Sequence, residues 1–175
     1  MVRVETSKTV HASQDKIFSL ITDFENLPSR FPNRYRSLKV IKRSENSVTV
    51  EEDVTVAGRE IHQITRHTFE PQRFLRSEVV DGDTRGTIVE IILDPADSGS
   101  INTKVSVNAD FKLGRLGSVL GVFAKGKIKG GLDHMVEEFG NVVNKMSWKY
   151  ILGILYWAVG IWIKIPLNPK TKYRL

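Results

Sequence analysis

The sequence predicts an α+β domain in which one antiparallel sheet is covered by a long C-terminal helix. Short strand-like segments separated by turn signals follow one another from residue 35 to residue 111, as in an antiparallel meander. From Leu132 to Met146, apolar residues recur every three or four positions, which is the period of an amphipathic helix. The chain has 175 residues, of which 41% are hydrophobic, and this size suits one domain with its own core.

The N-terminal part is predicted to contain one strand and two short helices. Residues 3–10 have the pattern of a strand, and Ser13 is the expected N-cap of a helix. The buried face of this helix is expected to consist of Ile17, Phe18 and Ile21. Pro28 and Pro32 then interrupt a second short helix or turn. Six further strands complete a seven-stranded sheet, over residues 35–43, 47–56, 60–69, 74–80, 86–93 and 101–111.

Two of these strands separate a core face from a solvent face by strict alternation. In residues 47–56, Glu52 shares its face with four valines, including Val54. The core face of the last strand is expected to be Ile101, Thr103, Val105, Val107, Ala109 and Phe111. One apolar and one polar face is typical of an antiparallel sheet. Glu52 is therefore predicted to be a carboxyl group among apolar side chains.

The long helix provides an apolar stripe that can cover the sheet. Its members are Met135, Val136, Phe139, Val142, Val143 and Met146. The glycine-rich segment before it, residues 113–131, has two interpretations. It is either a flexible or partly helical segment near a cavity mouth, or an earlier start of the long helix.

Residues 148–165, WKYILGILYWAVGIWIKI, form an apolar tail with no polar face, so an apolar medium is expected to cover it on every side. Eighteen helical residues span roughly 27 Å, just short of a ~30 Å hydrocarbon core. Pro166 and the basic end of the chain also argue against a full crossing. Four arrangements remain open: a marginal full crossing, a helix lying in one membrane leaflet, a helix buried in a homo-oligomer and an intramolecular core helix. The expected membrane or oligomer contacts are Trp148, Tyr150, Trp157, Trp162 and Lys164. We divide the chain into a ligand-binding domain, residues 1–146, and this tail, residues 147–175.

The net charge of +6 is concentrated in two runs without acidic residues, 28–44 and 111–132. A solvated surface, a site for anionic lipid headgroups and an RNA site are the three interpretations. Nucleic acid is not an expected partner, because neither run has interleaved aromatic residues. The absence of cysteine excludes disulfides and thiolate chemistry. No apolar signal segment opens the chain, so we expect a cytoplasmic protein whose tail contacts the inner face of the membrane.

The chain resembles the polyketide cyclase/dehydrase and lipid-transport group of the START and birch-pollen-allergen-like superfamily (SRPBCC). The resemblance is carried by VRVETSKTVHASQDKIFSLITDFENLPSRFPN at the start and by RHTFEPQRFLRSEVVDG further on. It covers about residues 2–146 and stops before Trp148. It implies a helix-grip fold, in which the seven-stranded sheet wraps around the long helix. It also implies an apolar cavity for a lipid, sterol, quinone or polyketide-like ligand.

No residue set predicts a metal site or a cofactor. His62 and His67 lie five apart on one strand and so face opposite sides, which prevents local chelation. No nucleotide-binding fingerprint or nucleophile motif is present, so we expect neither a cofactor nor a defined catalytic set. Glu52 remains a candidate base or ligand partner with a raised pKa, against a carboxylate paired with arginine or placed at a wet cavity mouth. His67 is interpreted first as a core histidine.

Two main functions and a third remain open at this point. The first is non-enzymatic binding or transport of a hydrophobic small molecule at a membrane surface. The second is a cyclase- or dehydratase-like enzyme that uses Glu52 or His67 in the same cavity, and the third is a protein- or ribosome-interaction domain. The side chains expected around the ligand are Tyr35, Glu52, Val54, His67, Val105, Val107, Phe111, Leu120, Phe123, Met135 and Phe139.

Overall fold

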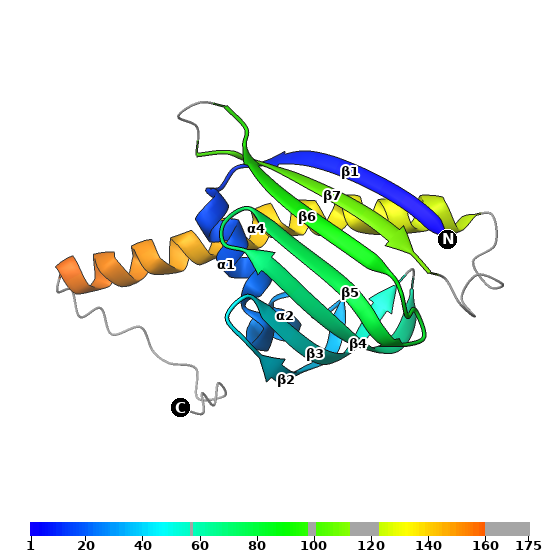
Figure 1. The fold of residues 1–175 in the computed structure, drawn as a ribbon. Helices are drawn as coiled ribbons and strands as arrows, with labels where there is room; N and C mark the ends of the chain where they lie inside the picture. The colour runs from blue at the N-terminus through cyan, green and yellow to red at the C-terminus, as the bar shows by residue number, and fades with distance from the viewer. Residues whose placement is uncertain (57, 98–100, 113–122, 160–175) are drawn as a thin grey trace. The chain divides into compact units, whose positions relative to one another are not determined.

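Seven strands form one antiparallel sheet in the order β1-β7-β6-β5-β4-β3-β2 (Figure 1). The structure is a computed structural model that describes residues 1–56, 58–97, 101–112 and 123–159. The first strand pairs with the last, and β1 and β2 are the two edge strands of the sheet. The strands are β1 Val2–Val10, β2 Tyr35–Arg43, β3 Ser47–Val56, β4 Arg59–Glu70, β5 Phe74–Gly82, β6 Ile88–Pro95 and β7 Thr103–Phe111.

Helical segments connect β1 to β2 and follow β7. They are α1 Gln14–Thr22, the 3-10 helix η1 Phe24–Asn26, α2 Leu27–Arg30 and α4 Ala124–Val159. Ser13 is the N-cap of α1, as predicted. Ile17 and Ile21 are buried, whereas Phe18 is only partly buried and packs edge-on against Phe69.

The core lies between the sheet and the first part of α4, which the sheet curves around (Figure 1). The buried residues of α4 are spaced by three or four positions, as the amphipathic pattern predicted. They are Ile128, Leu132, Val136, Phe139 and Val143. Valines of β3 and β7, together with Leu20 of α1, are fully buried opposite them. The seven-stranded sheet with its long C-terminal helix is the predicted helix-grip arrangement.

Two expectations about element boundaries were wrong. Ile101 is 63% exposed and lies before β7, because the strand begins only at Thr103. Gly86 does not begin a strand; its φ of 84° places it in a turn, and β6 starts at Ile88. Of the two interpretations of the glycine-rich segment, the earlier start of the long helix holds for the described part, because α4 begins at Ala124. The remainder of that segment lies outside the described residues.

The chain divides into two compact units, the first of which is Met1–Asn144, while the second begins at Lys145. Helix α4 continues past Ser147 without a break to Val159. Among the described residues, no helix combines the length and the hydropathy that a membrane crossing requires. Of the expected tail contacts, Trp162 and Lys164 lie outside the described residues, as do the side chains of Trp148, Tyr150 and Trp157.

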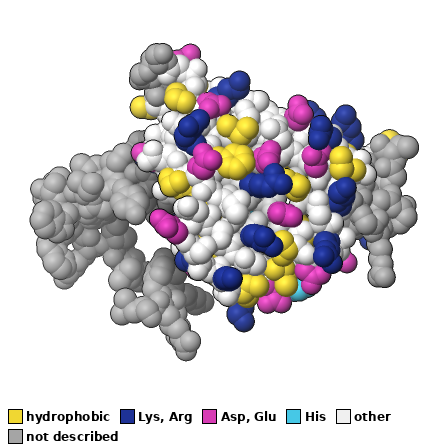
Figure 2. Space-filling view, viewed as in Figure 1, with side chains coloured by type: hydrophobic (Ala, Val, Ile, Leu, Met, Phe, Trp, Pro, Cys, Tyr) yellow, Lys and Arg dark blue, Asp and Glu magenta, His cyan; other side chains and the backbone are white. Residues whose placement is uncertain are grey.

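The first basic run is largely neutralised by ion pairs. Its arginines form the pairs Arg30–Asp23, Arg34–Glu138, Arg36–Glu60 and Arg43–Glu25. On the face in Figure 2, basic and acidic side chains are intermixed, with apolar side chains between them. This arrangement agrees with the interpretation of that run as a solvated surface.

Candidate ligand-binding cavity

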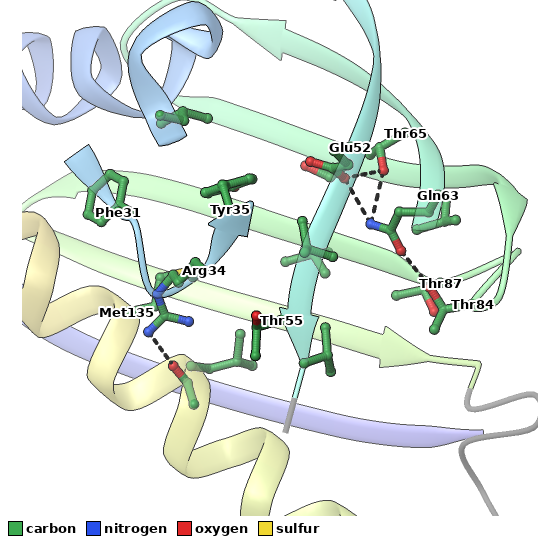
Figure 3. A pocket seen from close by; sticks show the side chains of 18 of the residues that line it. Phe31, Arg34, Tyr35, Glu52, Thr55, Gln63, Thr65, Thr84, Thr87 and Met135 are labelled. Atoms are coloured by element: carbon green, nitrogen blue, oxygen red, sulfur yellow. Dashed lines mark hydrogen bonds between the residues drawn. The ribbon is translucent and has the colours of Figure 1, made fainter. Parts of the chain in front are cut away.

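A partly open cavity of about 230 Å³ lies between the sheet, the short helices and α4 (Figure 3). Its walls include side chains of β3, β4 and β5, of η1 and α2, and of α4 between Lys127 and Phe139. Most of them are apolar, including Phe24, Leu27 and Ile91. Sites for drug-sized ligands typically measure about 300–1,000 Å³. The cavity is therefore suited to a small ligand with an apolar body.

The predicted ligand contacts fall into three groups. Those that line the cavity are Tyr35, Glu52, Val54, His67, Phe111, Met135 and Phe139. Val105 and Val107 do not line it; they are fully buried in the core, because β7 lies towards the β1 side of the sheet and the cavity lies mainly under β3, β4 and β5. Phe123 is 73% exposed and is also not a lining residue, since it precedes the first turn of α4. Leu120 lies outside the described residues.

Glu52 is the centre of a buried polar network. It is 4% exposed, and its Oε1 atom accepts hydrogen bonds from Gln63 Nε2 at 2.8 Å and Thr65 Oγ1 at 2.6 Å. Gln63 is held in turn by Thr84, whose hydroxyl donates to the amide oxygen at 2.7 Å. The sheet register explains the network, because Glu52 on β3 lies opposite Gln63 on β4. Figure 3 shows the resulting chain of hydrogen bonds from Thr84 to Glu52.

Burial controls the protonation of the two acidic groups at this end of the cavity. Burial raises the pKa of Glu52, and the hydrogen bonds from Thr65 and Gln63 only partly oppose this effect. The pKa of the Tyr35 phenol is also raised, mainly by burial and further by the neighbouring Glu52 carboxylate. The prediction of a raised pKa at Glu52 agrees with this result. The partners of Glu52 are an amide and a hydroxyl, rather than the arginine that the sequence left open.

His67 is a buried, uncharged imidazole on the same face of β4. Its Nδ1 atom lies 2.8 Å from Ser77 Oγ, and its ring stacks at a tilt on Phe24 with centroids 4.6 Å apart. Nε2 has no hydrogen-bond partner among the described residues. Burial lowers the pKa of His67 to about 3, so the ring is neutral at physiological pH.

Arg34 connects the segment before β2 to helix α4 at the edge of the cavity. Its Nε atom donates to Glu138 Oε2 at 2.8 Å, and its NH2 group donates to the backbone oxygen of Gly131 at 3.1 Å. Both Arg34 and Gly131 line the cavity. The sequence analysis assigned Arg34 only to a basic run, because no local pattern shows which acid on a distant helix will face it.

Several polar lining residues were not among the predicted ligand contacts. Gln63 and Thr65 follow the same alternation along β4 as His67, so period-two counting from His67 finds both. Thr84 lies in the turn between β5 and β6, and no sequence signal places it beside Gln63. Within the described ranges, no group of three His, Asp or Glu side chains has an arrangement that could hold a metal ion.

Comparison with known proteins agrees with this architecture. The family described as polyketide cyclase / dehydrase and lipid transport matches residues 1–140. A solved structure from Thermus thermophilus is 15% identical, with a TM-score of 0.71 over 83% of this chain and 99% of its own. A START superfamily protein from Mycobacterium smegmatis is 20% identical, with a TM-score of 0.70 over 82% and 98% of the two chains. The Zhui aromatase/cyclase of a Streptomyces species is 17% identical, with a TM-score of 0.65 over 85% and 94%.

These identities are low enough that the likeness to solved structures concerns the fold alone. No curated protein matches the chain. The family match, in contrast, extends over most of the sequence and ends within α4. On this evidence the chain belongs to the polyketide cyclase/dehydrase and lipid transport family, with the helix-grip fold of the START and birch-pollen-allergen-like superfamily.

Proposed function

We propose that this protein binds or transports a hydrophobic small molecule in the cavity without transforming it. The observation that carries the proposal is the cavity itself, a partly open space of about 230 Å³ that is lined mostly by apolar side chains. The description of its family names lipid transport beside polyketide cyclases and dehydrases. Among the polar side chains in the wall, Glu52, Gln63, Thr65 and Thr84 are positioned by hydrogen bonds to one another, as in sites that orient a ligand.

An enzyme of the cyclase or dehydratase kind is the second candidate. Glu52 and His67 both line the cavity, which is the arrangement that this candidate requires. The imidazole is a poor general base, however, since a pKa of about 3 gives it little affinity for a proton at neutral pH. Glu52 accepts no hydrogen bond from a second titratable group among the described residues. Binding without catalysis therefore accounts for the geometry more simply.

We also propose that the apolar tail holds the domain at a membrane surface. Residues 151–163 carry no charge, and the backbone of α4 is helical as far as Val159. An amphiphilic or apolar ligand partitions into membranes, so a domain held there meets its ligand at high local concentration. Burial of the tail between copies of the chain is the competing arrangement, and the oligomeric state of the detergent-free protein distinguishes the two.

Two neighbouring glycines of α4 provide a matched test of the cavity. An added Cβ at either Gly130 or Gly131 meets no atom within 4 Å, but only Gly131 lines the cavity. Leucine at either position gains the same helix propensity over glycine. We expect native mass spectrometry of the full chain to detect a co-purified apolar molecule. Gly131→Leu should reduce the bound fraction several-fold, and Gly130→Leu should leave it unchanged.

The opposite results would contradict the proposal. If the purified chain carries no small molecule and binds no apolar aromatic probe in solution, the cavity has no binding function. If the two leucine variants lose the ligand equally, the ligand is held outside the cavity. Turnover of a bound compound that stops in Glu52→Gln would favour the enzyme.

A further inference from the structure

The two oxygens of the Glu52 carboxyl group have different surroundings. Oε1 accepts two hydrogen bonds, from Gln63 Nε2 and Thr65 Oγ1. Two bonds use both lone pairs of a carbonyl-type oxygen. Figure 3 shows these bonds on one side of the carboxyl group. Among the described residues, Oε2 has no hydrogen-bond partner, although Glu52 lines the cavity. Oε2 is therefore the carboxyl atom available to a ligand.

The same geometry distinguishes the two protonation states. No lysine, arginine or histidine forms an ion pair with Glu52 in the described part of the chain. A buried carboxylate without a cation carries a large desolvation cost, which the neutral acid avoids. In the neutral acid, Oε1 is the carbonyl oxygen that accepts both bonds, and the proton resides on Oε2. The network then contains no buried charge at Glu52 and presents one O–H donor.

We infer that Glu52 binds the ligand as an uncharged O–H donor, and that the ligand is an uncharged molecule with a hydrogen-bond-accepting oxygen, such as a carbonyl or ether. This inference rests on the proposed function, because it assigns the polar contact within the same cavity. It makes Glu52 the residue that determines specificity. An ammonium ligand would require an ionised Glu52, and a pure hydrocarbon would leave the donor unpaired.

Three probes of nearly the same shape test the inference. Acetylnaphthalene carries a carbonyl oxygen, ethylnaphthalene carries none, and naphthylethylamine carries an ammonium group at the corresponding position. We expect the full chain to bind the ketone about three- to tenfold more tightly than the hydrocarbon, the factor that one net hydrogen bond contributes. The amine should bind no more tightly than the hydrocarbon. Dissociation constants from fluorescence titration give these ratios.

Two variants of Glu52 separate the neutral donor from an ionised carboxylate. Glu52→Gln retains an acceptor for Gln63 and Thr65 and presents an N–H in place of the O–H, so the preference for the ketone should persist. Glu52→Met presents no donor, so ketone and hydrocarbon should bind equally. If the methionine variant fails to fold, the glutamine variant and the three-probe ratio in the unaltered chain still distinguish a neutral donor from an ionised carboxylate at Glu52.

Each opposite outcome identifies which statement fails. Equal binding of ketone and hydrocarbon by the unaltered chain would overturn the role of Glu52 and leave the proposed binding function intact. Tightest binding of the amine, lost in Glu52→Gln, would show that the carboxylate is ionised and would also overturn the inference. Binding of none of the three probes would overturn this inference, and the absence of any co-purified small molecule as well would overturn the proposed function.

Discussion

Acidification is expected to destabilise this domain through His67 more than through any other histidine described. The side chain is 7% exposed, and its neighbours Ser77 and Phe24 are uncharged. Burial lowers its pKa to about 3, whereas an unfolded histidine titrates near about 6.5. Below that value the unfolded state binds a proton that the folded state does not accept. Stability attributable to His67 is therefore complete above about pH 6.5 and falls as the pH falls towards 3.

The size of the effect follows from the two pKa values. Each pH unit between them corresponds to about 1.4 kcal/mol of unfolding free energy. Between about pH 7 and about pH 5, only the interval below about 6.5 counts, which gives roughly 2 kcal/mol. A loss of this size is a substantial part of the roughly 5–15 kcal/mol by which domains are stable.

Urea unfolding of the full chain and of His67→Gln, at about pH 7 and about pH 5, measures this contribution. Glutamine keeps a polar group of similar size and does not titrate, so the unaltered chain should lose about 2 kcal/mol more than the variant on acidification. His62→Gln is the control, because His62 is exposed and its pKa is raised by its hydrogen bond to Asp53. A raised pKa makes the contribution of His62 increase at low pH, in the opposite direction. Equal pH dependence of the unaltered chain and His67→Gln would refute the reasoning.

Three further perturbations test the structure, and the two substitutions among them have matched controls. Gly82→Ala should destabilise the domain by more than about 1 kcal/mol, because Gly82 has a φ of 103° and its Cβ would lie 2.3 Å from a backbone oxygen. Gly58→Ala, with positive φ but open space, should cost less in the same thermal unfolding assay. Arg34→Gln removes the contacts with α4 beside the cavity and should increase the dissociation rate of acetylnaphthalene several-fold in stopped-flow fluorescence. Arg36→Gln, which breaks an exposed ion pair, should not change that rate. Removing residues 147–175 should abolish sedimentation with anionic vesicles, and continued sedimentation would contradict a membrane role for the tail.

The sequence predicted the sheet well because alternation is a local property. The bounds of β2 and β3 agree with the prediction, and the face shared by Glu52 and the valines of β3 is buried or lines the cavity. The start of β7 was wrong because Ile101 continues the apolar alternation although it is exposed beyond the paired segment. Alternation shows which residues share a face, but only pairing with a neighbouring strand determines where a strand begins.

The candidate site was predictable only in part, because a cavity depends on contacts between distant segments. Tyr35, Glu52 and His67 were found from their positions on inner faces. Val105 and Val107 have the same pattern on β7 but lie in solid core, and period alone cannot separate a cavity wall from a packed layer. The β5–β6 turn brings Thr84 to Gln63, and this contact has no local signature.

Glu52 and His67 share a feature that supports a binding role for this face of the sheet. Each is buried, each has an atom without a hydrogen-bond partner among the described residues, and neither is paired with an opposite charge there. Apolar residues of similar size would fill these positions with less desolvation cost. Buried polar residues that an apolar core does not require are concentrated at sites where proteins bind ligands. The hydrogen bonds from Gln63 and Thr65 stabilise the buried Glu52 side chain through Oε1 and leave Oε2 without a bond to either residue. The network therefore both stabilises the buried acid and leaves one atom of it for a ligand.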